Sequence, residues 1–76
     1  MIAEHASIVL TESLPSAGLD AADVGVVVHV HRNGEACEVE FLTLNGTTVA
    51  VETLTAQQVR AAGNRDIPQV RERLAA

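Results

Sequence analysis

The sequence has almost no aromatic residues, a single cysteine and no lysine. Trp and Tyr are absent and Phe41 is the only Phe, so the core has to be built mainly from Val, Leu and Ile. Because Cys37 is alone, no disulfide can form within the chain, and no segment has the features of a signal peptide. No apolar run approaches the ~20 residues of a membrane-spanning helix. We therefore expect a cytoplasmic protein that does not bind membranes.

The charge is acidic overall and unevenly distributed. Ten Asp and Glu residues face five arginines, and the net charge of -5 disfavours binding to phosphate backbones and anionic lipids. An alternative function remains, as a nucleic-acid or ribonucleoprotein accessory module that uses the arginines near the end of the chain. These arginines, which could also receive an acidic protein partner, are Arg60, Arg65, Arg71 and Arg73.

The middle of the chain has the alternation and turn signals of a β domain. Residues 7–11 predict a first strand, and residues 24–31, rich in Val, predict the clearest one. Asn33-Gly34 is typical of a two-residue type I′ hairpin turn, which places Val28 opposite Val39. The predicted inner face is then entirely apolar and consists of Val26, Val28, Val30, Cys37, Val39 and Phe41.

The second hairpin has two possible registers. A two-residue turn at Asn45-Gly46 would place Glu52 opposite Val39 on the inner face, which is unfavourable. A three-residue loop, residues 44–46 with Gly46 in the left-handed position, pairs Val39 with Val51 instead, and we predict this register. It leaves a surplus of apolar residues on the outer face, namely Val27, Leu42, Leu44 and Ala50.

The C-terminal part is less regular. Residues 55–58 fit either a short helix that ends at Gly63 or a single turn that leads into a strand at residues 59–61. Asp66 followed by Pro68 predicts the start of a helix, with Ile67, Val70 and Leu74 on one face. The expected organisation is a β domain over residues 1–62 and a helical tail over residues 63–76.

Several segments resemble a known family. Leu14-Pro15, Gly18-Leu19, residues 23–27, 38–41, 48–51 and 65–68 are similar to short bacterial proteins grouped as domain of unknown function 4926. Asp23-Val24-Gly25 before a valine-rich strand also resembles the start of SH3-like barrels, such as the KOW modules and the nitrile hydratase β chain. The resemblance implies a small five-stranded SH3-like (KOW-like) barrel and no known activity. Relatives encoded beside toxin-like proteins imply an antitoxin or inhibitor role.

Two groups of polar residues are candidate sites. His29 and His31 lie on one face of a strand with Glu38 opposite His29, and such a pair of imidazoles could belong to a metal-dependent subunit. Two ligands make an incomplete site, so we favour a solvated strand face with a His29–Glu38 pair. Cys37 faces the predicted core, away from both histidines, which excludes a catalytic thiolate pair. We expect no catalytic residue, no metal site and no cofactor.

The sequence therefore predicts a non-enzymatic protein-binding or oligomerisation module that forms homo-oligomers. The candidate acidic face, which could complement a basic partner, consists of Glu35, Glu38, Glu40 and Glu52. The candidate interface consists of the outer-face and tail residues Val27, Leu42, Leu44, Ala50, Ile67, Val70 and Leu74.

Overall fold

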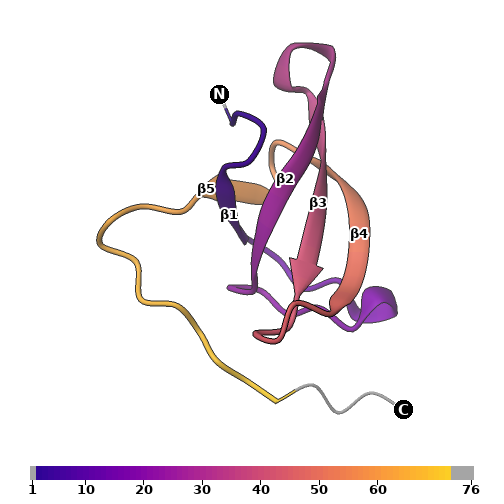
Figure 1. Ribbon diagram of the computed structural model, residues 1–76. Helices are drawn as coiled ribbons and strands as arrows, with labels where there is room; N and C mark the ends of the chain where they lie inside the picture. Colours follow the sequence, from indigo (N-terminus) through magenta and orange to yellow (C-terminus); the bar gives the residue numbers. More distant parts are fainter. Residues whose placement is uncertain (1, 73–76) are drawn as a thin grey trace.

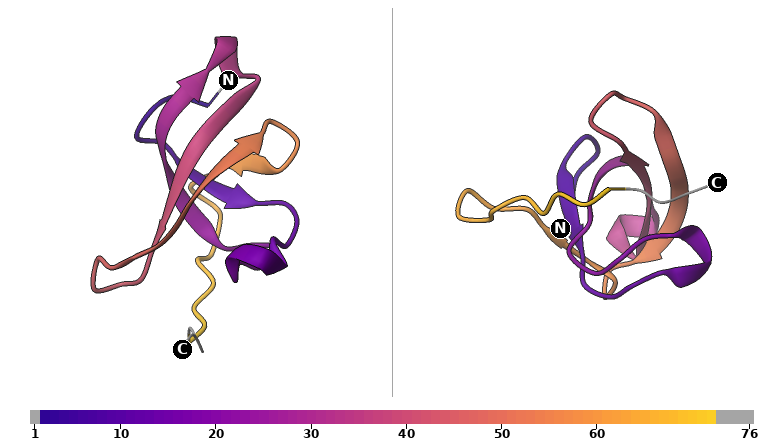
Figure 2. Two further views of the ribbon diagram at one scale, coloured as in Figure 1. Left: turned by 90° about the vertical axis from the view of Figure 1, so that its right-hand side faces the viewer. Right: turned by 90° about the horizontal axis from the view of Figure 1, so that it is seen from below.

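The computed structural model describes residues 2–72 and shows a mainly β protein (Figure 1). Five strands form one antiparallel sheet in the order β4-β3-β2-β1-β5, which curls around a small core (Figure 2). Within residues 2–72 the sheet is open, because β4 and β5 do not pair with each other. More than half of residues 7–62 lie in strands, as predicted. The elements are β1 (Ser7–Leu10), η1 (Pro15–Ala17), β2 (Val24–His31), η2 (Arg32–Gly34), β3 (Ala36–Leu42), β4 (Thr48–Thr55) and β5 (Val59–Ala61).

The predicted hairpin turn between β2 and β3 is confirmed. Asn33 and Gly34 both have positive φ, 59° and 93°, and the Glu35 N–H donates to the Arg32 carbonyl at 3.3 Å. Only Gly and short polar residues such as Asn adopt this backbone readily, which explains the choice of residues. Beside the turn the register is also as predicted, with His29 opposite Glu38.

Further along the same hairpin the predicted register is wrong because β2 contains a bulge. The pairing shifts between Val27 and His29, so that Val27 lies opposite Val39 and Val26 opposite Glu40. An extra residue in one strand reverses which side chains face the core. Val27 is consequently fully buried, whereas Val28 is 41% exposed.

The β3–β4 loop forms as predicted, but the strand register beyond it does not. Gly46 has φ 86° and its N–H donates to the Thr43 carbonyl at 2.9 Å, as expected for the three-residue loop. The pairing then shifts between Phe41 and Leu42, and Val39 lies opposite Glu52. The prediction that Val39 pairs with Val51 is therefore wrong, because a second bulge moves β4 by one residue.

Gly25 allows the two hairpin strands to pack tightly over the core. A Cβ atom at this position would lie 2.5 Å from Val39 Cγ1 and 2.9 Å from Phe41 Cε2. Cys37 is buried, as predicted, and burial raises the pKa of its thiol. The core consists of the buried residues Ile8, Leu10, Leu19, Val27, Cys37, Val39, Phe41, Leu54 and Val59.

Residues 55–61 follow the second of the two predicted alternatives. The Gln58 N–H donates to the Thr55 carbonyl at 3.0 Å, and the Thr55 N–H donates to Gln58 Oε1 at 2.9 Å. This single turn leads into β5, which pairs with β1 through Leu10 and Val59. These two bonds satisfy the backbone N–H groups of Thr55 and Gln58, so the turn does not need to continue as a helix.

The predicted C-terminal helix is not present in the described part of the tail, residues 63–72. Asp66 does not cap a helix, because its Oδ2 accepts the N–H of the preceding Gly63 at 2.6 Å. Ile67 and Val70 are 92% and 80% exposed. A helix this short is marginal in water unless an apolar face packs, and these side chains do not pack. Leu74 lies outside the described residues.

Candidate protein-binding site

A groove of about 920 Å³ lies between the sheet and the tail, and we call it the tail groove. Its sheet side includes Val24 and Val26 of β2 and Leu42 of β3, and its tail side includes Ile67 and Val70. Val24 and Leu42 are 40% and 43% exposed, so these side chains are only partly covered. Apolar side chains left accessible in a hollow are typical of surfaces that bind another protein.

The bulge in β2 explains why this outer face is apolar. Because Gly25 and Val27 face the core, Val24 and Val26 have to face outward. The valine-rich strand therefore supplies apolar residues to both faces of the sheet. The outer ones form part of the tail groove.

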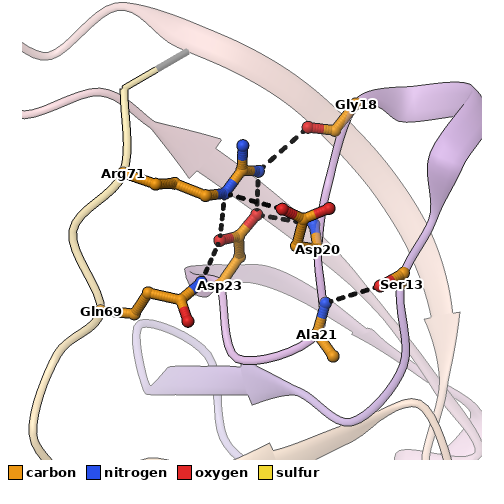
Figure 3. A network of polar contacts seen from close by, with 7 residues as sticks. All are labelled: Ser13, Gly18, Asp20, Ala21, Asp23, Gln69 and Arg71. Carbon is orange, nitrogen blue, oxygen red and sulfur yellow. Dashed lines mark hydrogen bonds and ion pairs between the residues drawn. The ribbon is translucent and has the colours of Figure 1, made fainter.

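Arg71 lines the groove and binds the loop between β1 and β2 (Figure 3). Arg71 Nε donates to Asp23 Oδ1 at 3.0 Å, and its terminal nitrogen donates to Asp23 Oδ2 and to the Gly18 carbonyl, the latter at 3.1 Å. Asp20 lies 3.3 Å from Arg71 Nε, and Gln69 Nε2 donates to Asp23 Oδ1 at 3.3 Å. The planar guanidinium suits this two-oxygen acceptor better than an ammonium group does. We call the acceptor group, Gly18, Asp20 and Asp23, the arginine socket.

The socket is shaped by contacts within the β1–β2 loop that do not involve the tail. Leu14 and Leu19 form a short bridge around η1, and Gly18 adopts the left-handed conformation with φ 71°. The Asp20 N–H then donates to Asp23 Oδ2 at 2.8 Å, which orients the carboxylate. Burial opposes ionisation of Asp23, whose side chain is only 14% exposed, but the bonds from Arg71 and Asp20 outweigh it and lower its pKa.

A second ion pair shapes the tail near its start. Arg60 donates to both Asp66 oxygens, at 2.8 Å and 3.0 Å, and the Gly63 N–H binds the same carboxylate. The Arg60 hydrogen bond and then the Gly63 N–H lower the pKa of Asp66 to about 2. Arg60 and Arg71 are thus both engaged by carboxylates.

The structure divides the candidate interface residues between the two sides of the sheet. Val27 belongs to the core, and Ala50 packs against it, so the prediction of an outer-face position is wrong for both. The remaining described members lie around the tail groove, namely Leu42, Leu44, Ile67 and Val70.

The four glutamates of the candidate acidic face do not share one face. Glu38 and Glu40 lie on the outer side of β3, whereas Glu52 lies opposite Val39 on the inner side. Glu35 is exposed beside the hairpin turn. The shift in β4 is the physical reason, because it turns Glu52 to the other side of the sheet.

His29 and His31 lie side by side, with ring centroids 4.6 Å apart. The carboxylate of Glu38 binds His31 Nε2 at 2.9 Å, whereas His29 Nδ1 lies 3.7 Å from Glu4 Oε2. The predicted His29–Glu38 pair exists only in the backbone register, because the Glu38 side chain reaches the other histidine. Among residues 2–72, no three His, Cys, Asp or Glu side chains come together as metal ligands.

The arginine socket was not predicted as a site. The available signal was the concentration of arginines in the tail, which indicated where an acidic group could bind. The acceptor is the chain's own β1–β2 loop, 48 positions away from Arg71. Because the two residues are so far apart in the sequence, no local sequence pattern predicts that they pair.

Residues 4–61 match the model of the family described as Domain of unknown function (DUF4926). The chain belongs to this family. The DUF4926 match contains all five strands and the arginine socket, and the tail follows it. No curated protein and no solved structure matches the chain. No helix within residues 2–72 has the length and apolar character needed to cross a membrane.

Proposed function

We propose that this DUF4926 protein is a non-enzymatic protein-binding module that receives its partner in the tail groove. The observation that carries the proposal is the group of accessible apolar side chains around that groove, on a protein of net charge -5. Covering a nearly fully exposed side chain such as Ile67 contributes roughly 1.5–3 kcal/mol, and covering Leu42, which is 43% exposed, contributes less than half of this. Several such contacts have to form together, because association also costs translational and rotational freedom.

The proposal includes an SH3-like barrel as the scaffold. The order β4-β3-β2-β1-β5 and the single turn that joins β4 to β5 support it. In this arrangement β4 and β5 are the two edges that a barrel would bring together. SH3-like domains carry many functions on one scaffold, so the function has to be argued from the groove.

Two observations favour a protein partner over a nucleic acid. The exposed apolar side chains of the groove are all aliphatic, whereas nucleic-acid sites present aromatic rings and free cations. Arg60 of β5 and Arg71 of the tail are already neutralised by Asp66, Asp20 and Asp23. Such a module acts by occupying its partner, as an antitoxin-like or regulatory protein of the bacterial cytoplasm does.

Site-specific photo-crosslinking in the source cell tests this proposal. A photoreactive phenylalanine analogue at Leu42 lies in the groove, and the same analogue at Val28 is the matched control, since the two side chains are 43% and 41% exposed. Val28 is not among the groove residues. We expect the analogue at position 42 to give discrete protein adducts. The analogue at position 28 should not give the same adducts. The same adducts from both positions, or none from position 42, would contradict a binding groove.

A further inference from the structure

The tail is attached to the body by polar contacts near its start and near its end, including the Arg60–Asp66 ion pair and the Gln69–Asp23 hydrogen bond. At its start the Ala62 N–H donates to the Ser7 carbonyl at 3.0 Å, and at its end Arg71 occupies the arginine socket. Residues 61–72 are all exposed, and Figure 1 shows the tail swinging away from the sheet after β5. The apolar residues Ile67 and Val70 therefore add little to the attachment within one chain.

The anchor is chemically specific although the segment before it is loose. The socket offers the Asp23 carboxylate, the Asp20 carboxylate and the Gly18 carbonyl to a single guanidinium. Asp23 is held in place by the Asp20 N–H independently of the tail. The site thus fits an arginine at the end of an extended apolar segment, whichever chain supplies it.

We infer that the occupant of the groove is the tail of a second copy of this chain, and that two copies exchange their tails reciprocally. Arg71 of each protomer then enters the arginine socket of its partner. The inference rests on the proposed function, since it names the partner of the same groove. Exchange requires no new anchor contact, because the bonds formed within one chain are formed again between two.

The unfilled groove favours exchange over attachment within one chain. With both ends fixed to the same body, residues 63–70 stand off from the sheet and leave about 920 Å³ beneath them. The tail of a second copy begins at the β5 strand of that copy. Its start is therefore not fixed beside the groove that it enters. Its Ile67 and Val70 can therefore settle against Val24, Val26 and Leu42, where they become buried.

The charges of the socket also fit the tail of a second copy. The chain has a net charge of -5, so two bodies repel each other unless cations lie between them. An exchanged tail places Arg71 of one protomer against Asp20 and Asp23 of the other. The second copy thus supplies the same cation that the chain's own Arg71 supplies, together with an apolar segment for the groove.

Mixing two defective variants of the full chain distinguishes exchange from attachment within one chain. Asp23→Asn disables the socket but keeps an oxygen for the Asp20 N–H, and Arg71→Ala disables the tail. Exchange predicts that each variant alone has a mass near 8.0 kDa by light scattering, while the mixture approaches twice 8.0 kDa. The reason is that the intact tail of the first variant can bind the intact socket of the second.

The remaining outcomes contradict the inference. A mixture that stays at the mass of one chain would show that Arg71 binds only its own Asp23, and single variants that remain dimeric would show that the contact does not join the copies. Circular dichroism of each variant establishes that it is folded. The crosslinks from Leu42 are a separate measurement, so the groove can bind another protein even if tail exchange fails.

Discussion

The Arg71 guanidinium donates hydrogen bonds to both carboxylate oxygens of Asp23, which lies 48 positions earlier in the chain. Asp23 directly precedes β2, and Arg71 lies ten positions beyond the end of β5. This contact joins the tail to the loop between β1 and β2, and both residues line the tail groove. The carboxylates that bind Arg60 and Arg71 should therefore titrate below their ordinary pKa.

We expect acid to weaken the tail contacts in a defined pH range. The pKa of Asp66 is about 2 in the folded protein against an ordinary value of 3.8. A lowered folded-state pKa means that the stabilisation is present above pH 4 or so and is lost as the pH falls toward 2. Carbon NMR of the carboxyl groups should give an Asp66 titration near pH 2 and an Asp23 titration below 3.8.

Arg60→Ala is the control for this titration. Without the guanidinium the Asp66 pKa should move back toward 3.8, although the Gly63 N–H still binds the carboxylate. The pKa of Asp23 should not change, because Arg71 is untouched. An Asp66 titration at its ordinary value in the unmodified protein would show that the Arg60 contact does not form.

The bulge in β2 is tested by the same substitution at two adjacent valines. Val27→Ala removes a fully buried side chain opposite Val39 and should lower the free energy of unfolding by about 2 kcal/mol. Val28→Ala removes a side chain that is 41% exposed and should change it by no more than about 0.5 kcal/mol. Urea unfolding of both variants makes the comparison. Regular alternation without a bulge predicts the opposite order.

The close approach at Gly25 predicts a large effect from one methyl group. Gly25→Ala places a Cβ atom against Val39 and Phe41, so we expect a loss of about 1–3 kcal/mol in the free energy of unfolding. Gly63→Ala is the matched control, because the nearest atom there is Asp66 Oδ2 at 3.6 Å. Thermal unfolding of the two variants should separate them clearly. Equal stability would show that the hairpin does not pack over the core at this distance.

The histidine pair should not bind metal tightly. His29 and His31 supply two imidazoles, while Glu38 is engaged by His31. A zinc titration followed by calorimetry should show no stoichiometric binding tighter than about micromolar, since a stable site needs three or four ligands. Saturable nanomolar binding that disappears in His29→Ala would favour the metal-dependent alternative.

The turns could be predicted from the sequence because their chemistry is local. Asn33-Gly34 and the loop at residues 44–46 depend on positive φ, which few residues adopt, and both form as expected. The bulges could not be predicted in the same way. Val27 and Val28 are chemically identical, so the alternation does not say which of them faces the core, and only the packing against Val39 decides.

The conformation of the tail could not be predicted for a different reason. Asp66 and Pro68 are correct start signals for a helix, but the same carboxylate can bind Arg60 and the Gly63 N–H, and it does so. The outcome depends on a residue in β5 that no local pattern connects to Asp66. Part of the groove was predicted, namely Leu42, Leu44 and the apolar residues of the tail. The signal was that the sequence contains more aliphatic residues than one small core can bury.

Light scattering coupled to size exclusion tests the central claim, that the tail groove is a protein-binding surface filled by a second copy. The unmodified chain should have a mass near twice 8.0 kDa, and Leu42→Glu should bring it toward 8.0 kDa by placing a charge in the groove. Val28→Glu, at an equally exposed position outside the groove, should leave the mass unchanged. A mass of 8.0 kDa for the unmodified chain at every concentration would contradict the account.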